Sequence, residues 1–234
     1  MAPAQFARRI FHFMKRVIAI GDVHGCAVAL ESLLAAIKPQ RDDTLVVLGD
    51  WIDRGPDSKR SVQLLLDWRE KCRIVPILGN HEEMLLTALA RPFTLDDWLV
   101  CGGEATLRSY GVSDPARLPS EHVDYIRTWG DYYETGTHFF AHANYAADIP
   151  LNQQTWEYWR WEPLRVSMPG PHQSGKTAVV GHTSQKTGEI LDLDYLLCID
   201  TYCHGGGLLT ALEVGTSEIW QADGAGRLRD RSDR

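Results

Sequence analysis

Short apolar runs alternate with longer amphipathic segments over residues 16–90. Apolar, often β-branched runs that stop at glycine or polar residues predict three buried strands, at 17–21, 44–48 and 73–78. Apolar residues at helical spacing predict three helices, at 27–37, 58–69 and 82–90, the second with Ser58 as its N-cap. A strand–helix order of this kind predicts an α/β fold, with a mostly parallel sheet covered by helices.

The pattern changes in the second half of the chain. Helices and loops are expected over 91–135, and turn residues then separate further predicted strands at 137–141, 177–181, 189–193, 195–200 and 207–214. We therefore expect a basic N-terminal extension at 1–15, one domain at 16–222 and a polar tail at 223–234.

Composition narrows the class of protein. A chain of 234 residues with 44% hydrophobic residues can close one substantial core. Its net charge of -7 argues against binding a nucleic acid polymer, whereas bound cations could still attract a phosphate substrate. No apolar stretch is long enough to cross a bilayer, and the N-terminus lacks the apolar run of a signal peptide. We expect a cytoplasmic protein without a membrane partner, its five cysteines being free thiols.

Metal-capable side chains follow each of the three early strands. Asp22 and His24 come after the first strand, Asp50 after the second and Asn80 after the third. Ligands of an open parallel sheet gather at the carboxyl ends of its strands, so these residues should converge. Carboxylate, imidazole and amide donors suit Mn²⁺, Fe or Zn²⁺, and a shared aspartate can bridge two ions. A lone Asp after a strand is more often a helix cap, but three such clusters together favour a metal site.

The same clusters resemble a known family. The blocks GDVHG, GDWIDRG and GNHEE, at 21–25, 49–55 and 79–83, resemble the signature blocks of the phosphoprotein phosphatases, a branch of the calcineurin-like metallophosphoesterases. Weaker blocks around His142 and His182 extend the resemblance, which is greatest to compact bacterial and phage-type serine/threonine phosphatases. It implies a calcineurin-like metallophosphoesterase fold, with two mixed β-sheets sandwiched between helical layers.

The resemblance also implies a role for each site residue. Two divalent ions, with Mn²⁺ expected and Fe, Zn²⁺ or Mg²⁺ as alternatives, would be held by Asp22, His24, Asp50, Asn80, His142 and His182. Asp50 would bridge them, and a bridging water would attack phosphorus. His81 would be the general acid, oriented by Asp53. The phosphate would be bound by Arg54 and by a second arginine, for which Arg160 is the first candidate and Arg165 the alternative.

Two substrate classes fit this resemblance. We expect a serine/threonine protein phosphatase acting on a phosphorylated protein or a small phosphoester, and the alternative is a symmetrical bis(5'-nucleosyl)-tetraphosphatase. A fold without activity is disfavoured because every expected ligand is present. The sequence specifies no oligomeric state.

One further motif suggests a different class of protein. Residues 170–177, GPHQSGKT, match the Gly-x4-Gly-Lys-Thr pattern of a nucleotide-binding loop. Such a loop must lie between a buried strand and a helix, whereas here a β-branched segment follows it. We therefore interpret it as a surface loop.

Overall fold

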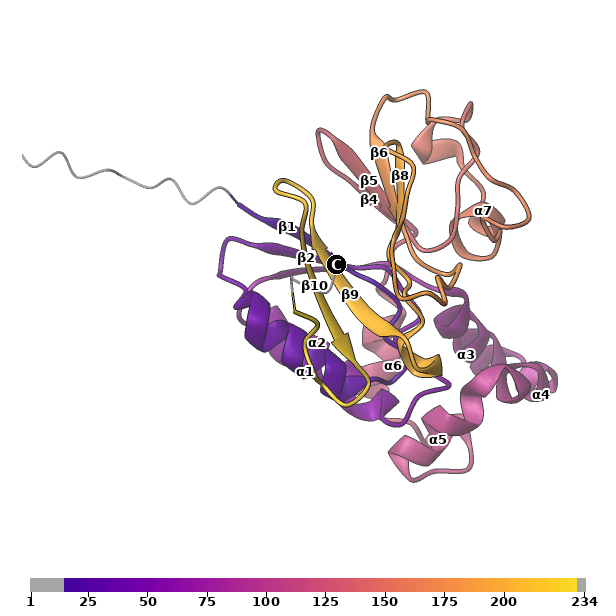
Figure 1. Cartoon of the computed structure of the whole chain (residues 1–234). Helices are drawn as coiled ribbons and strands as arrows, with labels where there is room; N and C mark the ends of the chain where they lie inside the picture. The colour runs from indigo at the N-terminus through magenta and orange to yellow at the C-terminus, as the bar shows by residue number, and fades with distance from the viewer. Residues whose placement is uncertain (1–14, 231–234) are drawn as a thin grey trace, which may run out of the picture.

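Two five-stranded sheets pack against each other in the computed structural model, which describes residues 15–230 (Figure 1). The proposed extension at 1–15 thus falls, apart from Lys15, outside the described residues, as do the last four residues of the polar tail. Both sheets mix parallel and antiparallel strands, and helices lie beside them. The expected α/β architecture of two mixed sheets with helical layers is confirmed.

The first sheet has the strand order β10-β9-β1-β2-β3. Its three parallel strands are the ones that the apolar runs predict: β1 (Val17–Ile20), β2 (Thr44–Val47) and β3 (Arg73–Pro76). The antiparallel strands β9 (Leu208–Glu213) and β10 (Glu218–Asp223) complete it. The sequence pattern did not identify β10, whose buried Gln221 interrupts the apolar signal. The Gln221 amide donates to the Gly188 carbonyl and the Thr210 hydroxyl, which makes its burial tolerable.

Two helices cover the outer face of this sheet. Helix α1 (Ala27–Ile37) packs on β9 and β10, and α2 (Ser58–Arg69) packs beside it (Figure 1). The expected N-cap of α2 was wrong by one residue, because the carboxylate of Asp57 accepts the Arg60 amide hydrogen at 2.9 Å. Ser58 begins the helix, and its hydroxyl accepts from the Asp53 amide instead.

The second sheet has the order β4-β5-β6-β8-β7. Its strands are β4 (Tyr132–Glu134), β5 (His138–Ala141), β6 (Thr177–Val180), β7 (Leu191–Asp192) and β8 (Leu196–Cys198). Strands β5, β6 and β8 are parallel, and β4 and β7 are antiparallel edges. Helix α7 (Trp156–Arg160) lies in the long connection between β5 and β6.

The remaining helices follow β3. Helix α3 spans Asn80–Ala90 and therefore begins two residues before the predicted start. The expected mixture of helices and loops comprises α4 (Leu95–Trp98), α5 (Glu104–Tyr110) and α6 (Ser120–Ile126). A π-helical turn lies at Leu99–Gly103, and 3₁₀ turns lie at Pro92–Thr94, Pro115–Arg117, Leu151–Gln153 and Cys203–Gly205. None of the helices within residues 15–230 is long and apolar enough to cross a membrane.

The polar segment after β10 folds back along that strand. The Arg229 amide donates to the Gln221 carbonyl at 2.9 Å, and the Asp223 amide donates to the Arg227 carbonyl at 3.0 Å. A β-carbon at Gly226 would contact Val28 and Ser32 of α1. The described part of this segment thus lies against the first sheet and its helix.

The central apolar layer joins the two sheets. It consists of buried residues from both: Ala19, Val46, Leu48, Ile77, Phe140, Val179, Ile199 and Leu212. This layer fixes one sheet relative to the other. Because the parallel strands of each sheet end near it, the loops that follow them meet in space.

Replacing Phe140 with alanine should therefore lower the free energy of unfolding by about 3–5 kcal/mol, since it removes a ring from the layer between the sheets. Phe140 is fully buried, whereas Phe93 is 83% exposed and provides a matched control. Urea denaturation of F140A and F93A would measure both changes. Equal stability of the two variants would contradict the assigned role of this layer.

Candidate metal centre

Each candidate ligand lies just beyond the carboxyl end of a parallel strand. Asp22 and His24 follow β1, Asp50 follows β2 and Asn80 follows β3. His142 comes directly after β5, and His182 comes two residues after β6. Five strand ends from two sheets therefore contribute to one cluster, as the sequence predicted for the first three.

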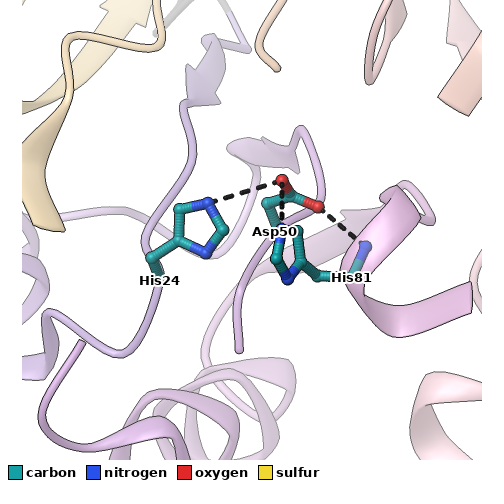
Figure 2. A group of neighbouring side chains, drawn as sticks. All are labelled: His24, Asp50 and His81. Carbon is teal, nitrogen blue, oxygen red and sulfur yellow. Dashed lines mark hydrogen bonds and ion pairs between the residues drawn. The ribbon is translucent and has the colours of Figure 1, made fainter. Parts of the chain in front are cut away.

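Asp50 is the centre of this cluster. Its Oδ2 lies 3.4 Å from His24 Nε2 and 3.9 Å from His81 Nε2, and its Oδ1 lies 3.3 Å from His142 Nε2. Figure 2 shows the rings of His24 and His81 both directed at the Asp50 carboxylate. The Asp50 side chain is buried and also accepts the His81 amide hydrogen at 3.1 Å. Asp50 thus belongs to two groups of donor atoms, one with His24 and His81 and one with His142 and His182. The atoms of each group lie close enough together to hold a metal ion.

Hydrogen bonds to the backbone fix the orientation of three imidazoles. The Nδ1 atoms of His24 and His142 lie 2.9 Å and 2.7 Å from the Ile52 and Leu48 carbonyl oxygens, and His182 Nε2 lies 3.1 Å from the Trp161 carbonyl. A carbonyl oxygen can only accept, so each of these nitrogens carries the hydrogen. The other nitrogen of each ring then presents a lone pair to the cluster, as in metal-ligating histidines.

Lone pairs consequently face each other without a proton between them. His142 Nε2 lies 3.1 Å from His182 Nδ1, and both lie close to Asn80 Oδ1, at 3.0 and 3.1 Å. Burial lowers the pKa of His24, His142 and His182, the last to about 3, so the rings are neutral. Converging acceptors repel one another unless a cation lies among them. The donor set therefore fits a divalent metal ion.

Buried carboxyl groups lie among these acceptors. Asp22 accepts the His182 amide hydrogen at 3.0 Å. Burial, followed by the charges of Asp200 and Asp50, raises the pKa of Asp22 well above its ordinary value. Asp200, which the sequence analysis did not assign to the site, accepts from the Ser184 hydroxyl at 2.7 Å.

His81 and Asp53 form a separate buried pair beside the cluster. His81 Nδ1 donates to Asp53 Oδ2 at 2.8 Å, and Asp53 also accepts from the Trp98 indole and the Thr106 hydroxyl. Burial alone would lower the pKa of His81, but Asp50 and the bond to Asp53 raise it. His81 Nε2 is buried and has no hydrogen-bond partner within the described chain. A raised pKa favours the charged ring, which donates to the site from Nε2 when it is protonated.

Glu82 is an organising residue to which the sequence analysis gave no role. Its buried carboxylate accepts backbone hydrogens from Gly79, Asp50, Trp51 and Ile52, at 3.1, 2.9, 2.7 and 3.2 Å. Burial and the neighbouring charge of Asp50 raise the pKa of Glu82 to about 7. One side chain thus joins the loops after β2 and β3. The block GNHEE contained this residue, but only the folded contacts reveal what it binds.

The backbone of the site adopts a conformation that non-glycine residues rarely use. Positive φ angles occur at five proposed site residues: His24 (44°), Asp50 (48°), Asp53 (71°), Arg54 (66°) and His182 (60°). Such residues cost about 1–3 kcal/mol each and persist where surrounding contacts enforce them. Glycine allows the close approach, because a β-carbon at Gly49 would lie 2.7 Å from Gly79 Cα.

The two candidates for the second phosphate-binding arginine, Arg160 and Arg165, lie in different places. Arg54 donates to His24 Nε2 at 3.1 Å and lines a cavity of about 620 Å³ next to Asp50 and His182. Arg165, the alternative, lines the same cavity. Arg160 does not, because its guanidinium binds Asp131 at 2.5 Å and Glu83 at 3.3 Å. The structure therefore brings Arg165 to the site and keeps Arg160 in a neighbouring groove.

Two other sequence interpretations can be compared with the structure. The segment 170–177 leads into strand β6, so the helix that a nucleotide-binding loop requires is absent here, and Lys176 pairs with Glu134 at 2.6 Å. The interpretation as a surface loop is confirmed. All five cysteines are free, and all but Cys101 are buried.

Comparisons with known proteins agree on the family. A family model described as calcineurin-like phosphoesterase matches residues 15–207. Serine/threonine-protein phosphatase 1 of Salmonella typhimurium is 30% identical over 92% of this chain and 99% of its own length. A symmetrical bis(5'-nucleosyl)-tetraphosphatase of Acidovorax sp. is 45% identical, but over only 30% of this chain and 24% of its own length.

Solved structures show the same fold. A crystal structure named "putative diadenosine tetraphosphatase" has a TM-score of 0.70 and 24% identity, covering 90% of this chain and 94% of its own. A cold-active protein tyrosine phosphatase has a TM-score of 0.67 and 16% identity, covering 92% and 78%. With its two mixed sheets and its cluster of strand-end ligands, the chain belongs to the calcineurin-like phosphoesterase family, whose members hydrolyse phosphoric esters.

Proposed function

We propose that this protein is a metal-dependent serine/threonine protein phosphatase. The observation that carries the proposal is the set of unprotonated acceptors facing Asp50, formed by His142 Nε2, His182 Nδ1 and Asn80 Oδ1. The choice of substrate class is supported by the Salmonella phosphatase, which is similar along nearly its whole length. The free cysteines fit a reducing compartment, so we also propose a cytoplasmic location.

The ligands divide into two groups that share Asp50. Asp22, His24 and Asp50 would hold one ion, and Asp50, Asn80, His142 and His182 would hold the other, with Mn²⁺ as the proposed metal. Bound divalent ions would polarise a water and neutralise charge on the phosphoryl oxygens. Glu82 and the backbone carbonyls keep the ligands oriented.

The chain's own residues would bind the phosphate and move the proton. Arg54 and Arg165, which line the cavity beside Asp50, would hold the phosphoryl oxygens through their planar guanidinium groups. His81 would donate its Nε2 proton to the oxygen of the leaving serine or threonine. Asp53 would keep that ring oriented and favour its charged form.

Cleavage of dinucleoside tetraphosphates is the second candidate function. It is supported by the tetraphosphatases that match a stretch of 71 to 78 residues at 38–45% identity. That stretch is a third or less of this chain, and about a quarter of the relatives' own length. So local a match says little about the substrate of the whole protein.

Mn²⁺ should raise the melting temperature of the metal-stripped protein, because an ion that binds only the folded state stabilises it by about 2.7 kcal/mol at a hundredfold excess over its Kd. The variant H142Q should show a smaller shift. His138 begins β5, the strand that His142 follows, without belonging to the cluster, so H138Q should retain the full shift. Thermal unfolding with and without Mn²⁺ measures this, and an unchanged shift in H142Q would refute the ligand assignment.

Removing Arg165 should weaken phosphate binding. We expect R165A to raise the KM for p-nitrophenyl phosphate about tenfold or more, since a hydrogen bond to a charged group contributes about 1.5–3 kcal/mol. R160A should instead lower the melting temperature, because it breaks the contacts with Asp131 and Glu83. Steady-state kinetics and thermal unfolding of both variants test the assignment. A raised KM in R160A and a lowered melting temperature in R165A would reverse it.

The substrate class can be tested directly with the Mn²⁺-loaded enzyme. We expect kcat/KM for a phosphothreonine peptide to exceed that for diadenosine tetraphosphate, and D50N to abolish both activities by removing the shared ligand. Hydrolysis of the dinucleotide in strong preference to the peptide would overturn the proposed substrate. Full activity of D50N would overturn the bridging role.

A further inference from the structure

The cavity beside the metal ligands carries more positive charge than one phosphate requires. Three cationic residues line it: Arg54, Arg165 and Lys186. All three side chains are exposed to solvent. The only carboxylate in the lining is Asp50, whose charge the proposed metal ions would offset. With two arginines assigned to the phosphoryl oxygens, Lys186 is an additional cation at the mouth of the site.

Lys186 has no carboxylate partner among residues 15–230. Its Nζ atom lies 5.4 Å from the ring centroid of Tyr202, in a cation–π contact. The ring of Tyr202 is 4.9 Å from that of His204, which is in turn 4.5 Å from that of His24. A continuous row of rings therefore leads from Lys186 to a proposed metal ligand, and His204 borders the site.

The loop that carries Lys186 is anchored on both sides. Before it, the Ser184 hydroxyl and the Gln185 amide donate to Asp200, each at 2.7 Å. After it, the Gly188 carbonyl accepts from the Gln221 amide at 2.9 Å. The backbone is thus held while the lysine side chain stays exposed, an arrangement suited to presenting a charge to a ligand.

We propose that Lys186 is a specificity-determining residue that binds an anionic group carried by the substrate beside its phosphorylated residue. This inference rests on the proposed phosphoprotein phosphatase function. The partner would be the carboxylate of a neighbouring acidic residue or a second phosphate on the same peptide, because both offer oxygen acceptors to an ammonium group. A peptide with neutral neighbours would leave Lys186 without a counter-charge.

The test compares phosphothreonine peptides that differ only at one flanking position, which holds glutamate, glutamine, lysine or a second phosphothreonine. For each enzyme, kcat/KM is expressed relative to p-nitrophenyl phosphate, so that changes in the reaction itself cancel. We expect the wild type to prefer the glutamate peptide over the glutamine peptide about fivefold at the best position, the size of one partly exposed ion pair. That preference should fall as salt is added.

Charge variants of Lys186 separate a specific role from general attraction. K186Q should reduce the preference to near one, K186R should restore it, and K186E should favour the lysine peptide. Lys71 also lies over an aromatic ring, that of Trp68, but lines a different surface cavity, so K71Q should keep the wild-type preference. An equal loss of preference in K71Q would refute a local role for Lys186.

The remaining outcomes separate this inference from the proposed function. If phosphopeptides are hydrolysed and K186E leaves their ranking unchanged, the assignment of Lys186 fails and the phosphatase proposal stands. If only diadenosine tetraphosphate is hydrolysed, the proposed function fails and this inference fails with it. The response to glutamate against the second phosphothreonine identifies which anion Lys186 recognises.

Discussion

The repulsion among unprotonated acceptors around Asp50 is the constraint on which the rest of the site depends. Backbone carbonyls accept a hydrogen bond from one nitrogen of each of three imidazoles, so the other nitrogen of each ring directs its lone pair into the cluster. Lone pairs that converge in this way repel one another, and a bound cation would relieve that repulsion. These bonds fix the orientation of the proposed ligands, and the folded chain carries the cost of holding them close together.

That cost is visible in the backbone. Several site residues have positive φ angles, and Glu82 uses its whole carboxylate to hold the amides of two loops. Glycine at the strand ends lets these loops approach each other closely. The layer of apolar residues between the sheets supplies the opposing stability, since burying such side chains contributes about 1.5–3 kcal/mol each. Strain at the site is therefore supported by packing directly beneath it.

Two cavities near the proposed metal ligands differ in the charge of the side chains that line them. A basic cavity contains Arg54, Arg165 and Lys186, whereas tryptophans and Arg160 line a different groove. Arg160 is neutralised by two carboxylates, whereas Arg165 is exposed in the basic cavity. The two sides of the proposed metal ligands thus differ in the charge that they would present to a substrate.

Local sequence determined the early strands and helices, because their apolar spacing is set by strand and helix geometry alone. It also predicted that the proposed ligands after β1, β2 and β3 would meet, since parallel strands bring their carboxyl ends to one edge of a sheet. Strand β10, the charge state of the imidazoles and the roles of Glu82 and Asp200 depend on partners distant in the chain. The sequence also left open whether Arg160 or Arg165 is the second phosphate-binding arginine, because the contacts of both depend on distant partners. Only the folded chain places Arg160 against Asp131 and Arg165 beside Asp50, because contacts between separate loops decide where a long side chain lies.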